Sequence, residues 1–142
     1  AYSPEMVDGL TLGYARADQN VGVSLDNEKS TAYVKYATGG FTIGYQVSEA
    51  DHDTKSSSAD VVAYGVTYAV NDDFSIGYHS HTYEPDSAAS SSASFDQEST
   101  GISASYTMGG MTLGGAMNET DNMRGVDASD FSAYEFNLSF AF

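Results

Sequence analysis

The feature that most constrains this 142-residue chain is a strict alternation of large apolar and small side chains, which recurs eight times. In residues 9–17, for example, Leu10, Leu12 and Tyr14 fall on one face of an extended chain, and small residues fall on the other. Because successive side chains of a β-strand point to opposite faces, the pattern predicts eight strands. The predicted strands are residues 9–17, 29–37, 41–49, 60–70, 74–83, 99–108, 111–118 and 131–142.

The connections between these strands alternate between short and long. Tight turns at residues 38–40, 71–73 and 109–110 follow the second, fourth and sixth strands. The four other connections are long and polar, and they hold thirteen of the twenty acidic residues: residues 18–28, 50–59, 84–98 and 119–130. Residues 1–8 read as a turn that leads in to the first strand. This arrangement predicts an up-and-down antiparallel meander with four long acidic loops and with both termini at the short-turn edge.

Composition and charge narrow the function classes. The formal net charge is -15 and the five Lys and Arg residues are scattered, which argues against nucleic-acid binding. The chain has no cysteine, so it is not a disulfide scaffold. It has no apolar run of eighteen residues, which excludes a transmembrane helix but not membrane β-strands. It does not open with a signal segment, so we expect a mature product or a piece of something longer.

The two faces of the predicted strands suggest two different environments. One face is bulky and apolar, and the other is small, polar and almost uncharged, unlike the charged outer face of a soluble sandwich. We therefore predict a transmembrane β-barrel whose bulky face meets lipid. The predicted lipid-facing residues are Tyr14, Tyr45, Tyr64, Tyr68, Tyr78, Phe136, Phe140 and Phe142. The predicted pore-lining residues are Lys35, Gln46, His79, Glu135 and Asn137. A soluble lipocalin-like barrel with the bulky face inside is the alternative.

The inward side chains also bear on the size of the barrel. A closed eight-stranded barrel is just wide enough for side chains to fill, yet most inward residues here are Gly, Ala, Ser or Thr. A wall of small residues suits a water-filled lumen, which needs about sixteen to eighteen strands. The chain is therefore expected to form half of a sixteen-stranded porin barrel. A complete eight-stranded barrel, with a structural or adhesive role for its acidic loops, stays open as the alternative.

Three segments resemble a known family. Residues 133–142, AYEFNLSFAF, look like the closing strand of bacterial outer-membrane proteins, with alternating aromatic residues and a terminal Phe. The hairpin of residues 103–118 and the repeats FTIGY (41–45) and FSIGY (74–78) are similar to the C-terminal halves of alphaproteobacterial general diffusion porins. The resemblance implies a homotrimeric, sixteen-stranded channel for small hydrophilic solutes in the bacterial outer membrane, in contact with lipid and lipopolysaccharide, with its termini in the periplasm. It also implies a constriction loop folded into the lumen, and no segment matches that loop.

Few residues suggest site chemistry. His79 and His81 share a strand face, but without a third ligand nearby in sequence a solvated position in the lumen is favoured over a metal site. Weak Ca²⁺ binding is the alternative to a solvated loop edge at the acidic segments 51–53, 84–86 and 119–130, none of which has calcium-loop spacing. Glu135 would bias the lumen toward cations, partly offset by Lys35, and the acid-rich edge would attract cations as well. No enzyme motif is present, so we expect a passive channel without cofactors.

Overall fold

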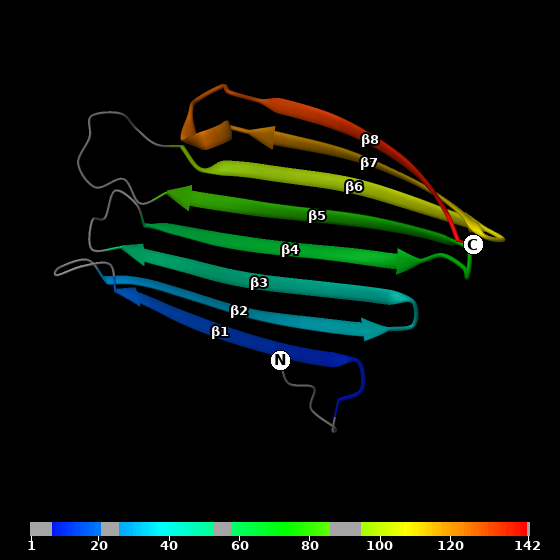
Figure 1. Cartoon of the computed structure of the whole chain (residues 1–142), viewed down its shortest axis with the longest axis horizontal. Coiled ribbons are helices and arrows are strands. Elements are labelled where there is room, and N and C mark those ends of the chain that lie inside the picture. Colours follow the sequence, from blue (N-terminus) through cyan, green and yellow to red (C-terminus); the bar gives the residue numbers. More distant parts are fainter. Residues whose placement is uncertain (1–6, 21–25, 53–57, 86–94, 142) are drawn as a thin grey trace.

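The computed structural model describes residues 7–20, 26–52, 58–85 and 95–141, and within them the chain forms one antiparallel sheet of eight strands (Figure 1). The strand order is the sequence order, so each strand pairs with its neighbours along the chain. The strands are β1 (Leu10–Asn20), β2 (Asp26–Thr38), β3 (Phe41–His52), β4 (Ala59–Ala69), β5 (Phe74–Pro85), β6 (Gln97–Met108), β7 (Met111–Asp121) and β8 (Phe131–Phe140). The all-β, up-and-down antiparallel architecture is thus confirmed.

At the edge of the sheet where the long loops lie, most strands extend further than predicted. The ladder between β1 and β2 continues to Asn20↔Asp26, and that between β6 and β7 continues to Glu98↔Asp121. Backbone pairing does not depend on apolar side chains, so it extends into segments that their polar composition assigned to loops. Eight of the acidic residues predicted to lie in loops therefore belong to strands: Asp18, Asp26, Glu28, Asp51, Glu84, Glu98, Glu119 and Asp121. The predicted loop boundaries were wrong to this extent.

The three predicted tight turns are confirmed. Between β2 and β3, Gly39 and Gly40 have φ angles of 53° and 85°, a left-handed pair that matches the twist of a two-residue hairpin. Between β4 and β5, the Asn71 side chain accepts hydrogen bonds from the backbone N–H groups of Asp73 and Phe74, at 2.9 and 2.8 Å. These turns fix the register of the strands that they join, and so decide which residues share a face.

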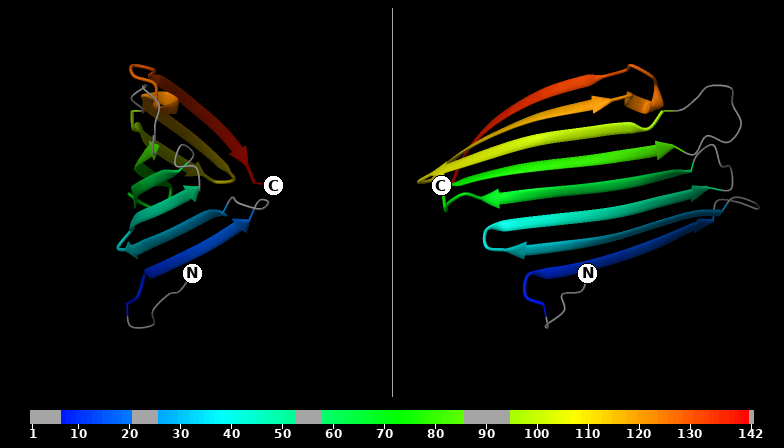
Figure 2. Two further views of the ribbon diagram at one scale, coloured as in Figure 1. Left: turned by 90° about the vertical axis from the view of Figure 1, so that its left-hand side faces the viewer. Right: turned by 180° about the vertical axis from the view of Figure 1, so that it is seen from behind.

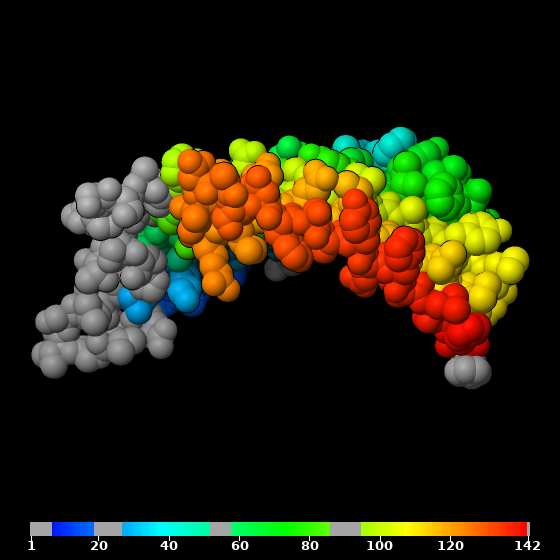
Figure 3. Space-filling model, turned by 90° about the horizontal axis from the view of Figure 1, so that it is seen from above, coloured from blue at the N-terminus to red at the C-terminus, as the bar shows by residue number. Residues whose placement is uncertain are grey.

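The sheet is an open arch (Figure 2). Strands β1 and β8 are its two edges, and they do not pair with each other, so the described strands do not close into an eight-stranded barrel. The space-filling view shows the same curvature from above (Figure 3). In the register, the concave side carries the small residues and the convex side the large apolar ones. We call these the inner face and the outer face.

The arch has no hydrophobic core. Among the described residues, Ala59 is the one buried apolar residue, at 8% exposure. No second layer built from the described residues covers either face of the sheet, whereas a globular domain packs at least two layers around a core. The described part of the chain also contains no helix long and apolar enough to cross a membrane. The lone helical element described is a short 3₁₀ turn, η2 (Met123–Gly125), between β7 and β8.

Candidate pore wall and outer face

The outer face presents a continuous band of exposed apolar side chains. Phe136 is 81% exposed, Tyr134 is 68% exposed and Tyr14 is 67% exposed. Every strand contributes at least one exposed large apolar residue to this band, which extends from the turn edge over most of the strand length. Exposed apolar patches on soluble monomers rarely exceed a few hundred Å². The outer face therefore needs a non-aqueous neighbour.

The residues predicted to face lipid lie on this outer face. They are Tyr14, Tyr45, Tyr64, Tyr68, Tyr78, Phe136 and Phe140, while Phe142 lies outside the described residues. Neighbouring rings make contact with one another across strands. Phe41 stacks on Tyr68 with their ring centroids 4.2 Å apart and their planes at 18°, and the centroids of Tyr64 and Tyr78 are 6.3 Å apart. Contact with lipid itself stays a prediction.

A hollow of about 730 Å³ interrupts the outer face. It lies where Ala104 of β6 stands directly opposite Gly115 of β7, two small residues in a band of large ones. Phe136 is the cross-strand neighbour of Gly115, and its exposed ring lines one side of the hollow. The outer face thus carries a protruding aromatic ring beside a recess.

On the inner face, hydroxyl groups of neighbouring strands form hydrogen-bonded pairs. The oxygens of Ser75 and Ser105 are 2.9 Å apart, those of Thr31 and Ser48 are 2.8 Å apart, and those of Thr107 and Thr112 are 3.0 Å apart. Cross-strand Thr and Ser pairs stabilise sheets modestly, by about 0.2–1 kcal/mol relative to alanine pairs. Their small size also keeps the inner face free of bulk, as a water-filled lumen requires.

The larger side chains of the inner face lie against neighbouring glycines. The ring of Tyr33 covers Gly13, and the side chains of His79 and Asn118 lie over Gly101 from opposite sides. In each case a Cβ atom on the glycine would overlap with the covering side chain. Because glycine has no side chain, a neighbouring Tyr or His side chain can lie over it against the sheet. These large side chains therefore project less from the inner face.

All five residues predicted to line a pore lie on the inner face. Lys35 pairs with Gly44, and His79 pairs with Gly65 on one side and Gly101 on the other. The Gln46 side chain donates a hydrogen bond to the Ser48 hydroxyl at 3.1 Å. Glu135 and Asn137 line a hollow of about 260 Å³ over β4–β8. That water fills the space beside these residues stays a prediction.

The carboxylates of the strands are sorted by face. Among described side chains, those that fall on the outer face are Asp18, Glu28, Glu49, Asp51, Asp60, Glu84, Glu98, Glu119 and Asp121. They form a belt beyond the apolar band, at the long-loop edge. Many stand directly opposite one another: Glu28 opposes Asp51, and Glu98 opposes Asp121. Such like-charge pairs are destabilising. On the inner face, Glu135 is the one strand carboxylate among described side chains.

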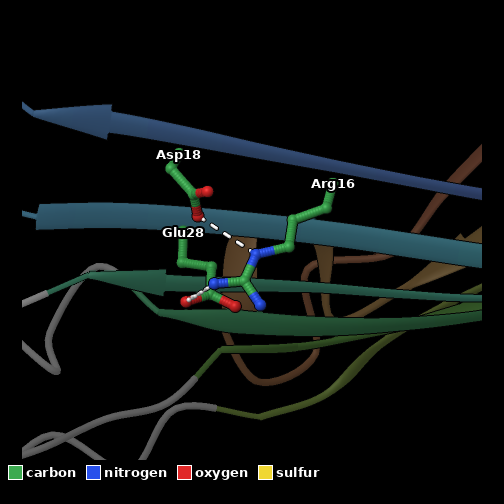
Figure 4. A network of polar contacts seen from close by, with 3 residues as sticks. All are labelled: Arg16, Asp18 and Glu28. Carbon is green, nitrogen blue, oxygen red and sulfur yellow. Dashed lines mark hydrogen bonds and ion pairs between the residues drawn. The ribbon is translucent and has the colours of Figure 1, made fainter.

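A single base partly neutralises the acidic belt. Arg16 forms ion pairs with Asp18 (Nε to Oδ1, 3.2 Å) and with Glu28 (Nη2 to Oε2, 2.9 Å), as Figure 4 shows. Because all three side chains are about half exposed, solvent screens this cluster and it contributes little to stability.

The described residues contain no grouped set of metal ligands. Within the described ranges, no three His, Asp or Glu side chains are grouped so that they could hold an ion. His79 and His81 share the inner face, as their spacing predicts, without a third ligand. Asp53 and Asp86 of the acidic segments lie outside the described residues. Weak Ca²⁺ binding at these segments stays a prediction.

Sequence reasoning missed one feature of the inner face. The segment after β7, predicted to be a solvated acidic loop, forms η2 and brings Arg124 beside inner-face residues of β5 and β6. The Arg124 backbone N–H donates to Oε1 of Gln97 at 2.9 Å. Neither residue stands out in the sequence, because the contact joins positions 27 residues apart.

Comparison with known proteins does not identify the chain. No family model matches it, and neither the curated proteins nor the solved structures include a significant match.

Proposed function

We propose that this chain forms about half of the wall of a sixteen-stranded outer-membrane porin, a passive channel for small hydrophilic solutes and ions. The observation that carries the proposal is the exposed apolar outer face of a sheet whose described residues form a single layer without a hydrophobic core. A bilayer supplies the apolar phase that such a face needs, and strand pairing satisfies the backbone groups within it. The small, hydroxyl-rich inner face is suited to water.

The open edges support a larger ring. β1 runs away from the turn edge and β8 runs toward it, so each can pair with a further antiparallel strand. Unpaired N–H and C=O groups at such edges are strongly unfavourable inside a membrane, which favours completion by further strands. A wall of eight more strands with similar curvature gives the wide lumen that small inward side chains imply.

We place the chain in the outer membrane of a Gram-negative bacterium, with the tight turns and both termini on the periplasmic side, and with lipid and lipopolysaccharide around the band.

A homotrimer follows from the resemblance to general diffusion porins. The exposed Phe136 ring and the hollow at Ala104 and Gly115 are compatible with a subunit contact on the outer face. Such surfaces bury protruding rings into recesses.

The proposed preference for cations comes from the rim of the channel. The belt carboxylates point outward, so they act on ions through the long-range field at the entrance. The inner face itself carries Lys29 and Lys35 against Glu135 among its described strand residues. A rim effect is screened by salt, since the Debye length falls from about 30 Å at 0.01 M to about 3 Å at 1 M. Cation selectivity should therefore weaken strongly over this range.

Single cysteines test the orientation of the two faces, and the chain has none of its own. Val66→Cys on the outer face and Thr67→Cys on the inner face are adjacent positions of β4 at the same depth. In proteoliposomes, a water-soluble charged maleimide should label T67C at least about tenfold faster than V66C, because thiolates form in water and not in hydrocarbon. Equal labelling, or faster labelling of V66C, contradicts the proposal.

Planar bilayers and native mass test the channel itself. Stepwise conductance is expected, and a single ring should contain at least about twice the 15.0 kDa of this chain. A conducting or adhesive particle of 15.0 kDa would instead favour the small eight-stranded barrel, which requires a β1–β8 closure that the open sheet does not have. A chain that stays monodisperse in water without detergent would favour a soluble barrel.

A further inference from the structure

The segment between β7 and β8 is held in a specific conformation on the inner side of the loop edge. Asn122, Arg124 and Ala128 all have positive φ, at 52°, 61° and 54°, which L-residues rarely adopt. Local hydrogen bonds hold the turn, among them Met123 N–H to Ser129 O at 2.7 Å and Gly125 N–H to Asn122 O at 2.9 Å. Strained backbone that is held in this way is found most often at functional sites.

The same segment is tied to the start of β6. The Asn122 amide donates to the Asp96 carbonyl at 3.2 Å, and the Arg124 N–H donates to the Gln97 side-chain oxygen at 2.9 Å. Gln97 occupies an inner-face position of β6, between Tyr83 of β5 and the loop. These bonds place Arg124 at the inner face rather than in the acidic belt. In Figure 2, η2 lies on the concave side of the strands next to it.

Arg124 lines a hollow of about 550 Å³, a volume within the usual range of small-molecule sites. The other described lining residues are Val61, His81, Tyr83, Pro85 and Gln97. They offer four kinds of hydrogen-bond donor: a guanidinium, an imidazole, a phenol and the Gln97 amide, whose oxygen is already occupied by Arg124. Val61 and Pro85 add apolar surface at one side.

The charge at this hollow is opposite to that of the chain. None of the six described lining residues is acidic, although the net charge is -15. The nearest strand carboxylates, Glu84 and Glu98, are one residue away from Tyr83 and Gln97, and strand alternation turns them to the outer face. Arg124 is thus presented to the inner face while these two strand carboxylates point away. The loop carboxylate of Asp130 accepts a hydrogen bond from the Asn122 backbone N–H at 3.3 Å and is not among the described lining residues.

We propose that this hollow binds small aliphatic carboxylates at the entrance of the channel. A carboxylate is an acceptor-only group, complementary to this donor set, and a planar guanidinium can hold it through two parallel hydrogen bonds. Val61 and Pro85 accommodate the aliphatic part of the solute. The proposal deepens the proposed function, since it makes the entrance selective for one class of solute among those that pass. Arg124 and His81 are the residues that determine this specificity.

Succinate is the probe, and its neutral analogue succinamide is the control. The full chain in detergent micelles, labelled with ¹³C at histidine Cε1, is titrated by NMR at constant ionic strength. The His81 signal, assigned with His81→Gln, should shift saturably with succinate and not with succinamide. Arg124→Gln should weaken succinate binding by about tenfold, because it removes the positive charge and one of the two hydrogen bonds while the Gln amide can keep the other. Lys35→Gln removes another inner-face base outside the hollow and should change affinity less than about twofold.

Several outcomes overturn the proposal: unchanged affinity in R124Q, an equal loss in K35Q, binding of succinamide, or equally tight binding of inorganic phosphate. Urea unfolding midpoints check that the variants fold. If R124Q does not fold, Tyr83→Phe takes its place because it removes the phenol donor and keeps the His81 signal, and an unchanged affinity in that variant is again contrary to the proposal. Conductance without succinate binding overturns the carboxylate site alone, whereas binding without conductance overturns the channel alone.

Discussion

The two faces of this sheet use the same strands, the same backbone bonds and the same register, yet they are built for opposite environments. The outer face holds rings and branched chains that nothing in the described structure covers, and the inner face holds hydroxyls and glycines. In a soluble domain the apolar face is the buried one. The usual relation between core and surface is therefore inverted here, because the solvent for the large residues is expected to be lipid.

The largest expected effect comes from placing a charge on each face at the same depth. Val66→Arg puts a guanidinium on the outer face and should lower the free energy of unfolding by about 2–4 kcal/mol in lipid vesicles. Thr67→Arg puts the same group on the inner face, where water can solvate it, and should change that free energy by less than about 1 kcal/mol. Urea titrations followed by tyrosine fluorescence measure both. Similar losses in the two variants would abolish the distinction between the faces.

A smaller effect is expected from two glycines on one row of the inner face. Gly101→Ala should destabilise the protein by about 1 kcal/mol, because its methyl group displaces the side chains of His79 and Asn118. Gly44→Ala is the matched control, since the nearest atom to a Cβ there is the Val34 carbonyl oxygen at 3.9 Å. It should stabilise by up to about 0.5–1 kcal/mol through reduced chain entropy in the unfolded state. The difference between the two unfolding free energies is the measurement, and its absence would mean that His79 does not lie over Gly101.

The smallest expected effect is in the acidic belt. Asp121→Asn removes one member of the opposed pair with Glu98 and should stabilise the protein by about 0.5 kcal/mol at low salt, and by less at 1 M salt. Asp18→Asn is the contrast, because it removes a partner of Arg16 along with a negative charge. It should give no gain in the urea midpoint. A gain in D18N that equals the gain in D121N would show that net charge matters and that the Arg16 cluster does not.

Much of the fold could be predicted from the sequence because side-chain alternation is local. The spacing of residues such as Leu12, Val66 and Phe136 within their strands predicts the face on which each lies. The Gly39–Gly40 pair likewise predicts a tight turn at its own position. The predicted faces of all the described site residues agree with the register. The predicted ends of the strands at the loop edge were wrong. There the composition of residues such as Asp18 and Glu119 indicated loop, while backbone pairing with the adjacent strand continued.

Local residue spacing was enough to predict the eight strands, their antiparallel order and the sorting of large and small side chains, since a period of two residues needs no long-range information. The tertiary structure alone decided that the sheet stays open at β1 and β8, that the strand carboxylates gather in an outward belt, and that η2 brings Arg124 beside His81 and Gln97. These features depend on pairing between distant residues and on the path of a strained loop. The local pattern of a single segment predicts neither the pairing of distant residues nor the path of the loop.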